Sequence, residues 1–163
     1  TLQRLLQGQT RQLRRRNLVQ AKAFSDRLEA ALLRYQNRSI EAAEVLSELV
    51  KLAKDIRVAA QRGESMGLED DELAFYDALA DNPSALEEMG DETLKKIAQE
   101  LVEAVRKTVT VDWSIRESAQ AKMRIVIKRL LRKYKYPPDA AKAAVKLVLQ
   151  QAKLFGNELG DAA

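Results

Sequence analysis

Apolar residues recur at steps of three and four along most of this chain, the spacing that places side chains on one face of an α-helix. One such stripe is Leu94, Ile97, Ala98, Leu101, Val102 and Val105. Strand-like alternation is confined to the short link Val109–Val111. Amphipathic helices with short connections bury their apolar faces against one another. The sequence therefore predicts an all-α fold, a multi-helix bundle of about six to seven helices with short connections.

Caps and breakers divide the chain into expected helices. Two stripes precede residue 36, and the sequence leaves open whether they are continuous through Arg14–Arg16. A third helix is expected from near Ser39 to Gly63, because glycine commonly ends a helix. Its expected apolar face is Ile40, Ala43, Leu46, Val50, Ala53 and Ile56. Later helices are expected over residues 68–79, 83–90, 91–105 and 113–134, and a last one from Pro138 onward. The expected buried face of the last helix is Ala143, Ala144, Leu147, Val148, Gln151 and Leu154.

We expect a single helical domain over residues 1–163. Within it, residues 1–22 form a leading helix that can project, and residues 157–163 form a fraying tail. A chain of 163 residues is long enough for one domain with a real core and short for two. It begins without methionine, so we expect a fragment or a processed piece of a larger protein.

Absent residue types narrow the chemistry. The chain has no His and no Cys, so Ser-His and Cys-His triads and thiolate metal sites are excluded within it. Its six Gly residues form no phosphate-holding loop followed by Lys and Ser or Thr. Catalysis by carboxylates alone is the enzymatic alternative that remains, and it would require clustered acids with raised pKa values in a cleft. The sequence indicates no such cleft, and we expect no catalytic residue, cofactor or metal site in this chain. No run approaches the roughly 20 apolar residues that cross a bilayer, and we expect a cytoplasmic protein with no membrane partner.

The charges are distributed unevenly along the chain. Residues 1–63 hold 13 basic and 6 acidic residues, residues 64–103 hold 2 and 13, and residues 104–163 hold 13 and 5. This basic–acidic–basic order allows the ends and the middle to attract one another in the fold. It equally allows separate faces to meet different partners. The sequence does not decide between the two.

Two clusters of cations are candidate contacts with a partner. In the expected helix over residues 113–134, the apolar face is Ile115, Ala119, Met123, Val126, Ile127, Leu130 and Tyr134. On the opposite side lie Arg124, Lys128, Arg132 and Lys135. Arg14, Arg15 and Arg16 form the other cluster. Such side chains neutralise the phosphates of DNA or meet an acidic protein surface, and the alternative for both clusters is a solvated helix face.

Other clusters are interpreted as structural. Thr110–Glu117 contains caps and an apolar anchor for the helix that follows, Asp112, Ser114 and Trp113. The acidic run Glu69–Glu72 complements the positive end of a helix dipole and lacks the spacing of a calcium loop. Arg34–Arg38 is expected to fix the turn between two helices. Phe75, Tyr76, Trp113 and Met123 are expected in the core.

Several segments together resemble one family. They are, in order, residues 17–21, residues 24–43 with Asn37-Arg38-Ser39-Ile40, residues 72–79, residues 101–106, residues 111–117, and residues 128–138 with Tyr136-Pro137-Pro138. This order is similar to the carboxy-terminal helical region of the restriction, or motor, subunit of type I restriction–modification enzymes. The resemblance spans about residues 17 to 155, which is most of the chain.

The resemblance implies a non-catalytic helical assembly domain. It would dock an ATP-dependent subunit that translocates and cleaves DNA onto the methyltransferase core of the complex. The parent subunit would be a type I site-specific deoxyribonuclease that uses ATP and Mg²⁺, with its catalytic parts outside this chain. For a docking domain we also expect one helix that is more apolar on its outside than a free domain warrants.

The alternative function is direct binding of the DNA backbone by a helical module. Arg124, Lys128 and Arg132 would make these contacts together with the cluster Arg14–Arg16. The salt dependence of binding distinguishes the two functions, because binding to phosphates weakens steeply as the salt concentration rises.

Overall fold

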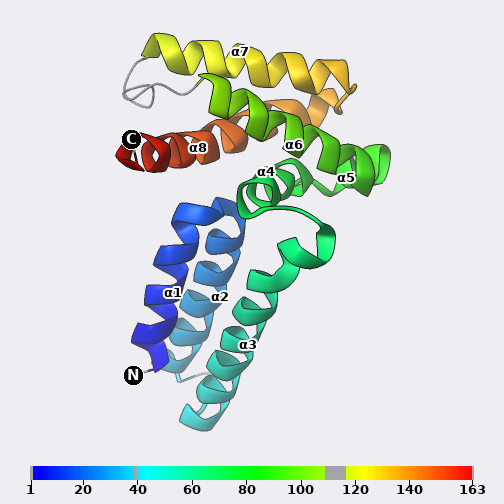
Figure 1. The fold of residues 1–163 in the computed structure, drawn as a ribbon. Coiled ribbons are helices and arrows are strands. Elements are labelled where there is room, and N and C mark those ends of the chain that lie inside the picture. The colour runs from blue at the N-terminus through cyan, green and yellow to red at the C-terminus, as the bar shows by residue number, and fades with distance from the viewer. Residues whose placement is uncertain (1, 39, 109–116, 163) are drawn as a thin grey trace.

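The structure is a computed structural model that describes residues 2–38, 40–108 and 117–162, with the side chains of these ranges except 15 and 156–162. Its described part contains eight helices and no strand, which confirms the all-α bundle (Figure 1). They are α1 (Leu2–Arg16), α2 (Leu18–Gln36), α3 (Ala42–Met66), α4 (Asp70–Ala80), α5 (Pro83–Met89), α6 (Asp91–Thr108), α7 (Glu117–Lys133) and α8 (Pro138–Ala162). The expected caps Asp112 and Ser114 and the anchor Trp113 lie outside the described residues.

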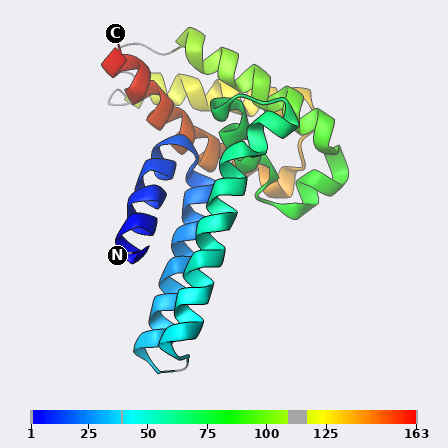
Figure 2. The same cartoon turned by 60° about the horizontal axis from the view of Figure 1, so that its bottom comes forward.

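The buried apolar side chains form two clusters. Helices α1, α2 and α3 make one, which we call the arm, around Leu6, Phe24, Leu28, Ala31, Val45, Leu49 and Leu52. Helices α4 to α8 make the other, which we call the head, with Phe75, Ile97, Met123, Ile127 and Val148 among its buried side chains. Figure 2 shows the arm extending away from the head, with the α2–α3 turn at its far end. The chain thus has two hydrophobic cores, one in a projecting three-helix arm and one in a helical head.

The leading helix is shorter than the expected residues 1–22. Helix α1 ends at Arg16, and the extended backbone of Asn17 separates it from α2. The Asn17 side-chain oxygen accepts a hydrogen bond from the backbone N–H of Gln20 at 3.1 Å, which is an N-cap contact. The two N-terminal stripes are therefore separate helices packed side by side. At the other end, α8 runs to Ala162, so the backbone of 157–162 is helical where we expected a fraying tail.

The expected end of the third helix at Gly63 is wrong. Helix α3 continues to Met66, and Gly67 ends it in the left-handed conformation at φ 72°. The backbone N–H of Leu68 donates to Gly63 O at 2.8 Å and that of Gly67 to Glu64 O at 3.2 Å, the two bonds of a Schellman motif. Gly63 is needed for another reason, because a Cβ there would lie 2.9 Å from the Leu68 carbonyl oxygen.

The buried face of α3 is also partly mispredicted. Val45, Leu49 and Leu52 face the arm core, whereas Ala43, Leu46 and Val50 of the expected stripe are exposed. The remaining members of that stripe, Ile40, Ala53 and Ile56, are half-buried against the arm core. Helix α3 thus has two apolar stripes, of which the arm buries one and covers the other only in part.

Helix α4 lies at the centre of the molecule, between the arm and the other helices of the head (Figure 1). All seven residues from Leu73 to Leu79 are buried. Its first turn contains the acidic run, in which Glu69 and Glu72 form a capping box. Phe75, Tyr76 and Met123 are buried as expected, and so is every member of the predicted α6 stripe. In α8, Ala144, Val148 and Gln151 are buried, but Ala143 is exposed.

The turn between α7 and α8 places a lysine where glycine is the usual residue. Lys135 has a positive φ of 57°. Its N–H donates to Arg132 O at 3.1 Å, and the Tyr136 N–H donates to Leu131 O at 2.9 Å. These bonds make a second Schellman motif, in which the left-handed residue has a Cβ that disfavours this conformation.

Replacing Lys135 with glycine is therefore expected to raise the free energy of unfolding by about 1 kcal/mol. Urea unfolding followed by circular dichroism measures the change. Arg129→Gly on an exposed helical position of α7 is the matched control and is expected to cost about 1 kcal/mol. Destabilisation by both substitutions would contradict the left-handed conformation at Lys135.

Candidate functional site

A groove between α7 and α8 gathers basic side chains from both helices. Arg124, Lys128 and Arg132 of α7 line it together with Lys142 and Lys146 of α8. Its apolar lining consists of Leu131, Tyr136, Pro138, Ala141, Val145 and Leu149. No acidic side chain belongs to the described lining. Three of the four predicted cations, Arg124, Lys128 and Arg132, therefore lie together, beside two lysines that were not predicted. The fourth, Lys135, lies in the turn after α7 and does not line the groove.

The five cations of the groove are exposed and lack acidic partners among the described residues. None of them has an ion pair with another described residue, and cations on each helix recur every four residues, or about 6 Å along the helix axis. Beneath them Leu131, Val145 and Leu149 are buried. The buried Tyr136 hydroxyl donates to Leu79 O at 2.6 Å, and burial raises its pKa to about 12, so it stays a neutral donor. The groove is thus an apolar base between two cationic edges.

The other predicted cluster does not join this groove. Arg14 lines a separate hollow with Arg11, Lys22, Asp26 and Asp81. Arg16 lines a third hollow with acidic residues that include Asp71. The side chain of Arg15 is outside the described set. Arg14 and Arg16 therefore face different surroundings, and no common track with the cations of α7 is formed by the described side chains.

The acidic middle of the chain is paired with both basic ends. Arg62 contacts Asp77 at 2.7 Å, Arg106 contacts Asp71 at 2.8 Å, and the Lys133 ammonium lies 3.5 Å from Glu100. The first alternative left open by the sequence, attraction between the ends and the middle, is therefore present in the fold, whereas contact of separate faces with different partners stays a prediction. Attraction within the fold uses these pairs, and the cations of the α7–α8 groove remain as a separate face.

A second candidate surface is the outside of the arm. Three large apolar side chains of α3 are exposed there, with exposed fractions of 55% for Leu46, 41% for Val50 and 68% for Val58. We call these three residues the apolar arm face. Leu46 and Val50 line a shallow hollow with Ala43, Ser47, Lys51 and Lys54. Helix α3 thus exposes three large apolar side chains, and whether they form the docking face expected from the sequence stays a prediction.

The turn at the tip of the arm has the structural role expected for Arg34–Arg38. Arg34 makes an ion pair with Glu48 of α3. The Asn37 N–H donates to Leu33 O at 2.9 Å and the Arg38 N–H to Tyr35 O at 3.0 Å. These contacts close α2 and hold its end beside α3.

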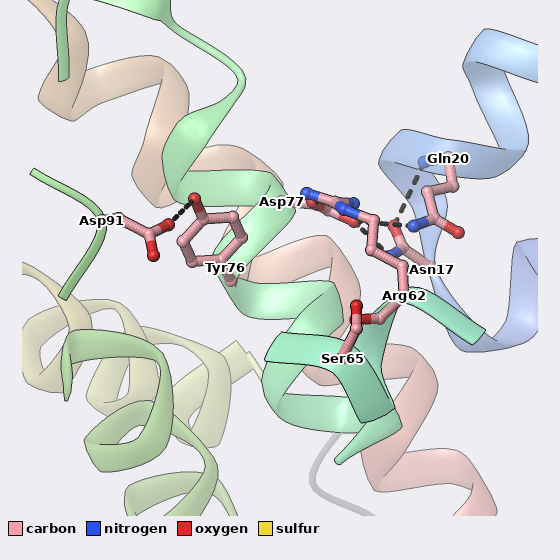
Figure 3. A network of polar contacts seen from close by, with 7 residues as sticks. All are labelled: Asn17, Gln20, Arg62, Ser65, Tyr76, Asp77 and Asp91. Atoms are coloured by element: carbon pink, nitrogen blue, oxygen red, sulfur yellow. Dashed lines mark hydrogen bonds and ion pairs between the residues drawn. The ribbon is translucent and has the colours of Figure 1, made fainter. Parts of the chain in front are cut away.

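A buried polar network joins the arm to the head (Figure 3). Asp77 of α4 is at its centre and only 6% exposed. One carboxylate oxygen accepts the side-chain amides of Asn17 at 2.7 Å and Gln20 at 3.1 Å, and the other accepts Arg62 at 2.7 Å. We call these four residues the junction. It ties the α1–α2 corner and α3 to the central helix of the head.

Two neighbouring contacts extend this connection. The Gln151 side chain of α8 accepts the Leu18 N–H at 2.8 Å and donates to Arg16 O at 3.3 Å, which satisfies the backbone at the α1–α2 corner. Tyr76 points the opposite way from Asp77 and donates to Asp91 (Figure 3). Burial, and then this hydrogen bond, raise the pKa of Tyr76 to about 12, while the bond lowers the pKa of Asp91.

The junction is not evident from the sequence. Asn17 and Gln20 lie at a helix start, and Asp77 lies 57 residues beyond Gln20 in the chain, so no local spacing connects them. The one signal was Asp77 itself, an acid within the apolar run from Leu73 to Leu79. A buried carboxylate needs hydrogen-bond donors, so an acid at this position predicts donors from other segments of the chain.

The described residues contain neither a candidate membrane span nor a candidate metal cluster. No helix among them is long and apolar enough to cross a membrane. No group of three or more acidic side chains in the described ranges is arranged to hold a metal ion.

Comparisons with known proteins identify the family. A family model described as "Type I restriction enzyme HindI endonuclease subunit-like, C-terminal" matches residues 1–158. The chain is 43% identical over 143 residues to the type I restriction enzyme HindI endonuclease subunit of Haemophilus influenzae, an overlap of 88% of this chain and 14% of that protein. No solved structure matches the chain.

A second relative comes from an archaeon. The chain is 36% identical over 119 residues to a protein of Methanocaldococcus jannaschii provisionally named the type I restriction enzyme MjaIXP endonuclease subunit. This overlap covers 72% of the chain and 11% of the relative. The chain therefore spans about a seventh of the length of these relatives or less. It belongs to the family of C-terminal regions of HindI-like type I restriction endonuclease subunits.

Proposed function

We propose that this chain is the assembly domain of a type I restriction endonuclease subunit, which docks that subunit onto the methyltransferase core. The apolar arm face supports this function. Leu46, Val50 and Val58 are exposed on a helix that extends away from the head (Figure 2). Burying such side chains against another protein is favourable, at about 25 cal/mol per Å² of apolar surface.

The chemistry of the enzyme then belongs to other parts of the subunit. The parent is a nuclease that depends on ATP and Mg²⁺ and works in the cytoplasm, and its catalytic residues lie outside this chain. The arm provides the contact, and the head holds the arm at a fixed angle through the junction. The domain then serves as the attachment of the motor to the partner that recognises and methylates DNA.

Charge on the apolar arm face is expected to abolish docking. The double variant Leu46→Glu, Val50→Glu places two carboxylates where the partner would bury apolar side chains, and both positions are exposed enough to leave folding intact. Co-purification with the cognate methyltransferase core at low and high salt measures docking. We expect salt-resistant association for the unchanged chain and at least a tenfold loss for the variant.

A matched control uses an apolar side chain that is similarly exposed on the head. Leu86 of α5 is 40% exposed, and Leu86→Glu is expected to dock as the unchanged chain does. Binding of the arm variant equal to that of the unchanged chain would refute the assembly function. Association with nonspecific duplex DNA alone, lost as salt rises, would replace it with the phosphate-binding alternative.

A further inference from the structure

We propose that the α7–α8 groove binds an acidic amphipathic helix of a partner protein. The groove combines an apolar base with five exposed cations along its edges. A helix with leucine-like side chains on one stripe and carboxylates on both flanks matches both features at once. Recognition of an amphipathic helix by an apolar groove is an established mode of peptide binding.

The apolar base is what favours a protein over DNA. Leu131, Val145 and Leu149 form the base, and half-buried Ala141 and exposed Pro138 also line the groove. The stems of the surrounding lysine and arginine side chains add further apolar surface at the edges. Phosphates and sugars gain nothing from such a base, whereas leucine or phenylalanine side chains are stabilised by leaving water.

The edge charges fix the register of the partner. On α7 the cations Arg124, Lys128 and Arg132 repeat every four residues, as Lys142 and Lys146 do on α8. Carboxylates four residues apart on a bound helix repeat at the same interval of about 6 Å. Each carboxylate of the partner then meets a cation that has no other acidic partner among the described residues. Partly desolvated pairs of this kind give specificity as well as attraction.

This surface is distinct from the apolar arm face. The groove is formed by α7 and α8 of the head, and the arm face belongs to α3. The two proposals therefore fail independently, because substitutions on one surface leave the other unchanged.

The test uses three designed 18-residue helical peptides and one duplex as probes for the 163-residue chain. The first peptide has a leucine stripe flanked by glutamates, the second replaces the glutamates with glutamines, and the third replaces the leucines with serines. The fourth probe is a 20-base-pair nonspecific DNA duplex. Fluorescence anisotropy measures each affinity at low and at physiological salt. We expect the leucine–glutamate peptide to bind at least tenfold more tightly than the other two peptides.

Variants of the groove connect that binding to this site. Lys128→Glu, Lys146→Glu is expected to weaken the leucine–glutamate peptide at least tenfold. Lys96→Glu, Lys107→Glu changes the net charge equally at exposed positions of α6 and is expected to leave the affinity unchanged. Ala141→Phe, which enlarges a side chain that lines the groove without altering any charge, is expected to weaken the same peptide. Thermal unfolding of each variant confirms that the fold is retained.

Three results would overturn the proposal. One is absence of peptide binding to the unchanged chain. Another is equal binding of the glutamate and glutamine peptides, which would leave the cations without a role. The third is tighter binding of the duplex than of any peptide, lost in the Lys128→Glu, Lys146→Glu variant but kept in Ala141→Phe. That result would assign the groove to the DNA backbone.

Discussion

Replacing Phe75 with alanine is expected to lower the free energy of unfolding by about 4 kcal/mol. The side chain is fully buried in the middle of α4, the helix that contacts both the arm and the rest of the head. Its ring meets that of Phe155 edge to face, with centroids 5.4 Å apart and planes at 84°. Removing the ring leaves a cavity that surrounding helices fill only in part. Urea unfolding followed by circular dichroism measures the loss.

The pairing with Phe155 provides an internal control. Phe155 is half-buried, so Phe155→Ala alone is expected to cost less than Phe75→Ala. The double variant should then cost less than the sum of the two, by about 0.5–1.5 kcal/mol for the edge-to-face contact. Leu33→Ala, at a position 57% exposed, is the surface control and should change stability by less than about 1 kcal/mol. A Phe75→Ala loss as small as that of Leu33→Ala would contradict this placement.

The fold was predictable wherever one helix has one apolar stripe. The α6 stripe from Leu94 to Val105 is buried throughout, because no other face of that helix is apolar enough to compete. Helix α3 has two stripes, and periodicity favoured the one with more members. The arm buries the other, around Leu49, because that face meets α2 in the folded chain. Which stripe is buried depends on the neighbouring helix, and a single helix does not encode that.

Helix ends were predictable where a side chain or a proline determines them. Asn82 and Pro83 begin α5 as expected, with the Asn82 side chain accepting the Ser84 N–H at 3.0 Å. The end of α3 was misplaced at Gly63 because either of two glycines could have provided the left-handed residue. Gly63 is instead required within the helix by a close contact, since Leu68 O leaves no space for a Cβ. Such a close approach exists only after folding.

The candidate sites were predictable in their charges but not in their geometry. The repeat of Arg124, Lys128 and Arg132 follows from helical spacing alone. Its partner edge, Lys142 and Lys146, became part of one groove only when the turn at Lys135 brought α8 beside α7. The junction was out of reach for the same reason, since its four residues come from three helices and a helix cap. Pairings between distant segments are set by the tertiary fold.

Asp77→Ala is expected to lower the free energy of unfolding by about 3 kcal/mol. The substitution leaves the side-chain amide of Asn17, which is 3% exposed, without its acceptor, and it also removes the partners of Gln20 and Arg62. Losing one member of a buried charged pair costs about 3–5 kcal/mol. The lower end applies here because 38% of the Arg62 side chain is exposed and can regain water. Urea unfolding gives the value.

Two companion variants distinguish the lost network from a general surface effect. Asp77→Asn keeps one acceptor oxygen, so its cost should be smaller than that of alanine. Glu29→Ala removes an exposed carboxylate from α2 and should change stability by less than about 0.5 kcal/mol. Because the junction links the arm to the head, hydrogen exchange in Asp77→Ala should accelerate more for amides of the arm than for those of α6. A cost below about 1 kcal/mol, with uniform exchange, would mean that apolar packing alone fixes the arm on the head.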